Sequence, residues 1–356
     1  MVVLNLIVNN VCNLDCGYCY VDSKKPGDPE GGLKYLPVEE MDFIFKTLEK
    51  NGLDVDMVHI FGGEPFLHPR LKDICFIIND ANIPINIATN GTLMEVHARW
   101  IHKFDVSLSV NLIPNDDAIN KILGSRFPLE RVMLASRNMV ESGIDVNGIV
   151  CVFPVGVNAR ENGTYYADYL HDLNEQTGIE NFFLLYFSRL GRGRKVWDNI
   201  DNKFYNADNW TLFLKSVRDE TKKKDFSYHV YVEPAFDSDI HPSLPPMYMQ
   251  CDMIIQGNLV VDYNLDMYPC ILMQEVRDAR WRKNLKENTG NITNVFIESQ
   301  HDFISEEGTV CRSCTELKFC CPCIPYIQEN GMDYRCKGNN TNQTPMGCPL
   351  VTIKLV

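Results

Sequence analysis

Three cysteines near the start of the chain have the spacing of ligands for an iron-sulfur cluster. Cys12, Cys16 and Cys19 form a C-x3-C-x2-C run directly after a short apolar stretch. Each of three such thiolates can hold one iron of a cubane, which leaves the fourth iron open for a substrate or cofactor. A zinc site with a distant fourth ligand is the alternative, although zinc sites usually pair two Cys-x2-Cys or Cys/His arms. The run therefore predicts an iron-sulfur centre with an open coordination position.

The same run, with Tyr18 before its last cysteine, resembles the signature of radical S-adenosylmethionine (SAM) enzymes. In that family a [4Fe-4S] cluster passes an electron to the sulfonium of bound SAM, and the resulting 5′-deoxyadenosyl radical takes a hydrogen atom from the substrate. The resemblance implies that the three cysteines hold this cluster. The protein would then supply positioning and exclusion of water.

Four later segments resemble the SAM-binding segments of this family and follow the first cysteines in strand order. Glu64, in a Gly-Gly-Glu-Pro element, would accept from the methionyl ammonium. Ser109 is similar to the serine that contacts the SAM carboxylate or ribose, and Lys121 stands where relatives often carry an arginine, whose bidentate fork a lysine lacks. Leu190 lies in a segment whose backbone would meet the adenine. The implied SAM-binding residues are Tyr18, Gly62, Gly63, Glu64, Pro65, Ser109, Lys121 and Leu190.

A second cysteine group lies near the end of the chain, where nine of the 14 cysteines fall between Cys251 and Cys348. Without a secretory signal, this crowding favours metal ligation over a disulfide framework. The group resembles the SPASM extension of radical SAM maturases, which carries two auxiliary [4Fe-4S] clusters. By that resemblance one cluster would take Cys311, Cys314, Cys320 and Cys348, and the other Cys251, Cys270 and Cys323, with Cys321 or Cys336 completing it or one iron left open.

The sequence departs from the SPASM pattern at three positions. Leu265 replaces the usual turn glycine five residues before Cys270, so we expect Asn264 to take the left-handed conformation instead. Ile324 stands where a thiol is expected, one place after Cys323. Gly257 stands where a thiol is expected after Cys251.

Three further residues of types that bind metals are interpreted as parts of the core. Cys75, on a helix expected over 71–78, and Cys151, in an apolar strand, are predicted to be buried thiols. His59 lies inside a strand and is expected to be a satisfied core histidine.

The first two hundred residues alternate apolar strands with helical patterns, which predicts a parallel α/β sheet. A helix is expected from Pro37 to the stop signal at Asn51 and Gly52. Periodicity leaves open a doubly wound sheet or a TIM-like barrel, and the family resemblance implies a partial (β/α)6 barrel with its site after the strands. The expected strands are 3–8, 57–61, 83–88, 106–110, 146–153 and 181–187. The expected domains are a barrel over 1–200, a helix and linker over 201–245, and a cysteine-rich domain over 246–356.

The chain of 356 residues has 34 basic and 47 acidic side chains, hence a net charge of −13, which argues against nucleic-acid binding. No run approaches the ~20 apolar residues that cross a bilayer. No signal peptide is visible. We therefore expect a cytoplasmic protein with no membrane partner.

Relatives with a SPASM extension oxidise or crosslink side chains in peptides and proteins. Ile271 follows Cys270 where anaerobic sulfatase maturases carry an acidic residue, which favours a maturase of a ribosomally made peptide over a sulfatase maturase. Expected partners are the peptide and a flavodoxin- or ferredoxin-type electron donor. Because only eleven residues precede Cys12, we expect a leader to bind the barrel, the extension or a separate leader-binding protein.

Other reactions remain open at this point. A sulfatase-maturase-like enzyme and a small-molecule dehydrogenase or epimerase would use the same scaffold. In an epimerase, Cys321 and Cys336 are the candidate catalytic hydrogen donors. A non-catalytic iron-sulfur electron-transfer protein would explain the thiols but not the Gly-Gly-Glu-Pro element.

Overall fold

The structure is a computed structural model of the chain. It describes residues 2–21, 23–27, 32–124, 126–198, 200, 202–205, 207–224, 226–232, 258–275, 281–290, 292 and 353–356. Within these residues no helix is long and apolar enough to span a bilayer.

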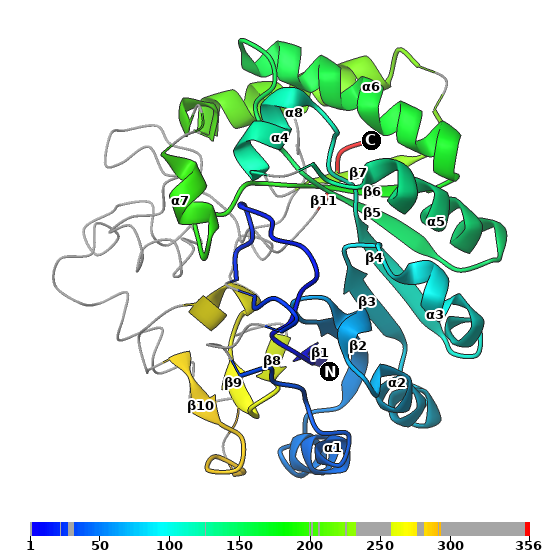
Figure 1. The fold of residues 1–356 in the computed structure, drawn as a ribbon, viewed down its shortest axis with the longest axis vertical. Helices are drawn as coiled ribbons and strands as arrows, with labels where there is room; N and C mark the ends of the chain where they lie inside the picture. Colours follow the sequence, from blue (N-terminus) through cyan, green and yellow to red (C-terminus); the bar gives the residue numbers. More distant parts are fainter. Residues whose placement is uncertain are drawn as a thin grey trace, which may run out of the picture.

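Seven strands of the first 232 residues form a parallel sheet in chain order, which curves into a partial barrel (Figure 1). Each strand pairs in parallel with the next, as in the registers Leu6 to Ile60 and Ile87 to Leu108. The strands are β1 (Val2–Ile7), β2 (Val55–Phe61), β3 (Ile85–Thr89), β4 (Val106–Asn111), β5 (Val146–Cys151), β6 (Asn181–Leu185) and β7 (His229–Val232).

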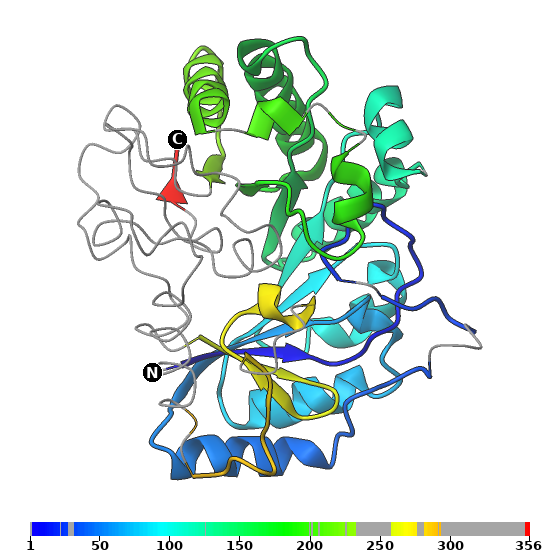
Figure 2. The same cartoon turned by 90° about the vertical axis from the view of Figure 1, so that its left-hand side faces the viewer.

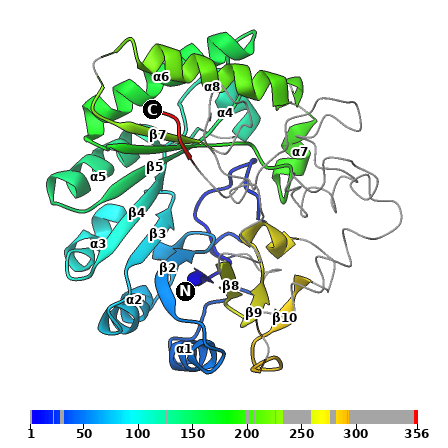
Figure 3. The same cartoon turned by 180° about the vertical axis from the view of Figure 1, so that it is seen from behind.

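Helices follow the strands and lie on the outer side of the curved sheet (Figures 1 and 3). Gly163 lets two of them approach closely, because a Cβ built on it would lie 2.4 Å from the Cβ of Ser216. The helices are α1 (Glu40–Lys50), α2 (Leu71–Asp80), α3 (Met94–Ile101), α4 (Asp117–Leu123), α5 (Leu129–Glu141), α6 (Ala159–Thr177), α7 (Gly193–Trp197) and α8 (Ala207–Thr221).

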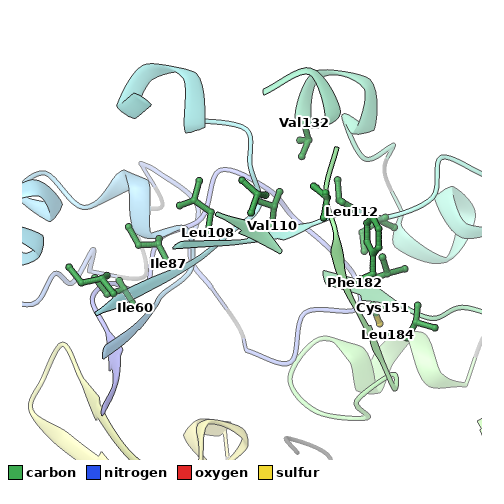
Figure 4. Close-up of a cluster of buried hydrophobic side chains, with 14 of the residues drawn as sticks. Ile60, Ile87, Leu108, Val110, Leu112, Val132, Cys151, Phe182 and Leu184 are labelled. Atoms are coloured by element: carbon green, nitrogen blue, oxygen red, sulfur yellow. The ribbon is translucent and has the colours of Figure 1, made fainter. Parts of the chain in front are cut away.

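Side chains of the strands alternate between the two faces of the sheet. In β4 every second residue is fully buried toward the helices, and the intervening residues are half-buried on the inner face. Figure 4 shows Ile60, Ile87, Leu108 and Val110 as neighbours in the buried layer. The helix-facing layer is therefore the core, and the inner face is left for a site.

Strands from the end of the chain complete both edges of this sheet (Figures 1 and 2). The hairpin of β8 (Asn258–Asp262) and β9 (Asp266–Tyr268) lies beside β1, with β8 parallel to it, and β10 (Lys283–Asn284) pairs with β9. At the other edge, β11 (Ile353–Lys354) pairs antiparallel with β7.

The α/β fold class and the partial barrel are confirmed, with all six expected strands present. The helix expected from Pro37 begins at Glu40 and stops at Asn51 and Gly52, as predicted. The strand β7 was not expected, and it lies inside the segment 201–245 for which a helix and a linker were expected. The domain boundaries stay a prediction, since most of 233–352 lies outside the described residues.

The turn of the β8–β9 hairpin corrects one expectation. Leu265 itself takes the left-handed conformation, with a φ of 64°, whereas Asn264 was expected to do so. The side chain of Asp262 accepts from the backbone N–H of Asn264 at 2.8 Å and of Asp266 at 3.0 Å, which fixes the turn. Because the Leu265 side chain is buried, packing holds the leucine where a glycine would be free of strain.

The predictions for the two isolated cysteines are confirmed, and the prediction for the histidine is wrong. Cys75 and Cys151 are buried in the core. His59 lies half-buried on the inner face of β2, where a ring nitrogen lies 2.9 Å from the Met57 sulfur, and burial lowers its pKa. The strand alternation decides this, because His59 falls between the buried Val58 and Ile60.

Candidate active site

The loop after β1 carries the three cysteines at the carboxyl end of the sheet. Cys12 is buried, Cys16 and Cys19 are half-buried, and none is in a disulfide. Burial raises the pKa of Cys12 to about 11. Burial, and then the proximity of the other two thiols, raises the pKa of Cys16 to about 12. Three neighbouring thiolates would repel one another here unless a cation neutralised them, which is what a metal centre does.

The three thiols are a donor set that suits an iron-sulfur cluster. A cubane takes each thiolate at a different iron, so Cys12, Cys16 and Cys19 would hold three of its four irons. A mononuclear zinc site would need a fourth ligand beside these three thiols.

The turn after β2 packs directly against the cysteine loop. A Cβ built on Gly63 would lie 2.3 Å from the backbone oxygen of Val11, so only glycine fits there. The side chain of Asn9 joins the two segments: its Oδ1 accepts from Gly63 N at 3.0 Å, and its Nδ2 donates to the Glu64 backbone oxygen at 2.9 Å. Gly63 therefore lets the turn after β2 lie directly against the cysteine loop.

Glu64 is fully buried where β2 and β3 end. Its Oε1 accepts from Phe66 N at 3.1 Å and Thr89 Oγ1 at 2.8 Å, and its Oε2 accepts from Asn90 N at 2.8 Å. Burial raises the pKa of this carboxyl to about 7, although the three donors oppose the shift. Glu64 therefore ties two strand ends together, and its contact with the methionyl ammonium stays a prediction.

The turn after β3 contacts the first cysteine. Asn90 Nδ2 lies 3.7 Å from Cys12 Sγ and donates to Asn13 Oδ1 at 2.9 Å. Asn13 Nδ2 in turn donates to Thr92 Oγ1 at 2.8 Å. This segment orients the cysteine loop through side-chain amides.

Two other elements hold the second half of the cysteine loop. Gly17 N donates to the backbone oxygen of Leu123 at the end of α4, at 3.3 Å. Lys121 is exposed in the last turn of the same helix. The segment after β6 holds Cys19 through its backbone, and Leu190 in that segment has a buried side chain.

Ser109 and Tyr18 lie in different surroundings from each other. Ser109 is inside β4, which continues to Asn111, rather than on a loop, and its Oγ donates to Asn86 Oδ1 at 3.0 Å on the inner face. The Tyr18 ring packs edge-on against Phe153 at a centroid distance of 5.4 Å. Their contacts with SAM stay predictions.

Of the cysteines beyond residue 245, Cys270 is the one that the structure describes. It is buried just after β9, at the end of the β8–β9 hairpin. Burial raises the pKa of Tyr20, and the Cys19 and Cys270 thiols raise it further. These thiols therefore lie near the same phenol, one on the cysteine loop and one after the hairpin. The other expected ligands, Cys251, Cys311, Cys314, Cys320, Cys321, Cys323, Cys336 and Cys348, lie outside the described residues.

Two residues that shape this site were not expected from the sequence. Asn9 precedes the cysteine run, and its side chain forms hydrogen bonds with Gly63 and Glu64 of the glycine turn. Arg192 pairs with Asp15 inside the run. The presence of Asp15 between two cysteines was a signal for a cationic partner, but the sequence did not indicate which of the 34 basic residues it would meet.

Comparisons with known proteins agree with this geometry. Residues 6–162, which include all three cysteines and the turns after β2 and β3, match the Radical SAM superfamily. This part of the chain is a radical SAM domain. A probable GTP 3′,8-cyclase of Methanocaldococcus jannaschii is 32% identical over 149 residues, which are 40% of this chain and 46% of the relative. Human molybdenum cofactor biosynthesis protein 1 is 26% identical over 165 residues, 44% of this chain and 25% of the relative. The chain thus matches less than half of the length of these relatives.

Solved structures extend the similarity beyond the radical SAM domain. SuiB of Streptococcus suis bound to S-adenosylmethionine is 18% identical with a TM-score of 0.70, covering 94% of this chain and 75% of SuiB. SuiB bound to its precursor peptide SuiA gives the same TM-score, covering 96% of this chain and 76% of SuiB. At 18% identity, this similarity shows that the chain shares the fold of SuiB.

Proposed function

We propose that the protein is a radical SAM enzyme that oxidatively modifies or crosslinks a side chain of a ribosomally made peptide. The observation that carries the peptide assignment is the likeness in fold to SuiB, a protein solved with a precursor peptide bound, over 96% of this chain. In the proposal Cys12, Cys16 and Cys19 hold a [4Fe-4S] cluster, which supplies the electron that cleaves SAM.

Around that cluster, the chain's own residues would orient the cysteine loop and bind SAM. Asn90 and the segment after β6 hold the cysteine loop at its two ends. Glu64, Ser109 and Lys121 are the proposed partners of the SAM amino, carboxylate or ribose groups, together with Tyr18, Gly62, Gly63, Pro65 and Leu190. Within the described residues, the Glu64 carboxylate oxygen Oε2 accepts from one donor, Asn90 N, so it retains capacity for a further one.

The inner face of the sheet supports a peptide over a nucleotide triphosphate. In β1–β7 the half-buried inner positions carry no Lys, Arg, Asp or Glu. A triphosphate would require several cationic donors, whereas amide and hydroxyl side chains suit the uncharged amides of a peptide. The polar side chains at these positions are Asn5, His59, Asn86, Ser107, Ser109, Asn111, Asn147, Asn181 and Tyr231.

The cysteines beyond residue 245 are the basis for proposing two auxiliary [4Fe-4S] clusters. Removal of a hydrogen atom from a side chain leaves a carbon radical, which must lose one more electron to give an oxidised product. Auxiliary clusters would accept that electron. The reconstituted protein should then bind about twelve irons. We further propose a flavodoxin- or ferredoxin-type donor, a separate leader-binding protein and a cytoplasmic location.

The class of chemistry is tested by 5′-deoxyadenosine formation. The anaerobically reconstituted protein is incubated with SAM and dithionite, beside the Cys12→Ala/Cys16→Ala/Cys19→Ala variant. The variant should lose about four irons and all SAM cleavage. Cleavage that persists in the variant, or its absence from the wild type, would contradict the proposal.

The substrate is tested with peptides encoded by short reading frames beside the gene, and with GTP. A peptide substrate should accelerate 5′-deoxyadenosine formation and lose a pair of hydrogen atoms by mass spectrometry, and deuterium placed on it should appear in 5′-deoxyadenosine. Acceleration by GTP alone would replace the peptide with a nucleotide.

A further inference from the structure

The segment after β6 is fixed against the third cysteine by its backbone. The N–H groups of Arg192 and Gly193 both donate to the Cys19 carbonyl oxygen, at 2.9 and 3.3 Å. Gly191, with a φ of 51°, packs so closely that a Cβ on it would lie 2.5 Å from the Tyr20 carbonyl carbon. The position of Arg192 relative to Cys19 is therefore determined before its side chain is considered.

The Arg192 guanidinium lies within the cysteine loop. It forms an ion pair with Asp15, and its side chain is 16% exposed against 53% for Asp15. Asp15 also pairs with Lys25, at 2.6 Å, from the solvent side. An arginine guanidinium keeps its positive charge in proteins, so Arg192 places a cation at this position.

One donor of this side chain has no acceptor among the described residues. Arg192 Nε is buried and makes no hydrogen bond within the described residues. A buried unpaired N–H is costly, and it lies on a side chain that contacts a predicted cluster ligand. The sulfur atoms of a bound cluster would supply the missing acceptor.

We propose that Arg192 is a positioning residue that raises the reduction potential of the cluster on Cys12, Cys16 and Cys19. The inference rests on the proposed function, since it presumes that cluster. Reduction adds one electron, taken from the external reductant, and no bond forms or breaks. A largely buried positive charge and N–H donors beside the sulfur stabilise the more negative, reduced cluster. Asp15 holds the guanidinium in place and offsets part of its charge.

The test is a potentiometric titration of the full reconstituted protein, followed by electron paramagnetic resonance. The signal that changes when SAM is added identifies the radical-generating cluster among the three. Arg192→Gln should shift its midpoint to a more negative potential, and Arg192→Lys should shift it less. Lys25→Gln is the matched control, because Lys25 meets the same carboxylate but is 62% exposed, and it should leave the midpoint unchanged.

A second variant separates charge from structure. Asp15→Asn removes the negative charge that offsets the guanidinium, so it should raise the midpoint potential. If the Arg192–Asp15 pair only held the loop in shape, Arg192→Gln and Asp15→Asn would not shift the midpoint in opposite directions. An Arg192→Gln midpoint equal to that of the wild type would overturn the inference. If Arg192→Gln binds too little iron to titrate, Asp15→Asn decides, and an unchanged or lower midpoint overturns the inference. A wild type without any SAM-sensitive signal would instead refute the proposed function.

Discussion

At the residue scale, the cysteine loop depends on a position that has no room for a side chain. A Cβ on Gly63 would meet backbone atoms of Val11 and Cys12 at 2.3 to 2.9 Å, and backbone cannot rotate away as a side chain can. We expect Gly63→Ala to cost about 2 to 3 kcal/mol in the free energy of unfolding and to remove about four irons per chain. Urea denaturation and iron analysis measure both.

The control for this substitution is Gly32→Ala. Gly32 has no atom within 4 Å of a built Cβ, so the extra methyl group should change neither stability nor iron content. Equal behaviour of the two variants would show that the glycine turn does not set the shape of the cysteine loop.

Asp262 makes the stability of the protein depend on pH. Burial raises the pKa of this carboxyl from 3.8 to about 6, and the charge of Asp266 adds to the shift. The N–H groups of Asn264 and Asp266 and the charge of Arg282 oppose it. The Tyr268 hydroxyl donates to the other carboxyl oxygen. The folded state holds its proton longer than the unfolded state, so the free energy of unfolding falls as pH rises from about 4 to 6 and levels off above.

Asp262→Asn keeps an oxygen for the turn but cannot titrate. The stability of this variant relative to the wild type should therefore increase by about 2 to 3 kcal/mol between pH 4 and pH 7, as measured by urea denaturation across that range. A difference that is constant with pH would mean that the buried carboxyl has an ordinary pKa.

Part of the site could be predicted from single residues. The three cysteines and the glycine turn are recognisable from their local spacing. The structure places the two segments side by side. The contacts of Glu64 were not found, because a carboxylate that could bind a ligand can equally accept from Thr89 and Asn90, and only the folded positions of two strand ends decide between them. Asn9 gave no signal, since asparagine is common in loops of every kind.

At the element scale, the β8–β9 turn forces a leucine into the left-handed region. Substituting the buried Leu265 by alanine should cost about 2 to 3 kcal/mol through lost packing. Leu265→Gly loses the same packing but relieves about 1 kcal/mol of backbone strain, so it should be more stable than Leu265→Ala. This order reverses the usual one, in which glycine is the less stable in a strand or helix.

Leu259 provides the comparison, because it is equally buried in β8 and has an ordinary backbone conformation. There the alanine variant should be the more stable of the pair in urea denaturation. The same order at both positions would show that the turn carries no strain.

Elements were predictable where the pattern was long and bounded. The helix after Pro37 has a proline before it and Asn51-Gly52 after it, so its ends were nearly right. The strand β7 has four residues and stands just before a proline-containing stretch, too short for alternation to show. Its pairing with β6 and β11 is what makes it a strand, and such pairing is not visible in a local pattern.

At the scale of the whole molecule, the two ends of the chain share one sheet. The strand β1 needs β8 as its neighbour, and β7 needs β11; directly after β11, Leu355 N donates to Val230 O at 2.7 Å. The sequence predicted a separate domain after residue 245 because the cysteine content and the loss of the βα rhythm change there. A change in composition along the sequence is visible without a structure. Which strand edges the later segment pairs with is not visible in the composition.

A fragment of residues 1–232 should therefore not behave as an independent domain. Its truncation leaves β1 and β7 as open edges, and uncovered parallel strands with apolar side chains pair with other chains. We expect the fragment to aggregate, with little monomer in size-exclusion chromatography. Deletion of residues 353–356 alone opens the β7 edge and should have a smaller effect of the same kind. A soluble, monomeric 1–232 fragment that still binds about four irons would show instead that the boundary near residue 245 divides two folding units.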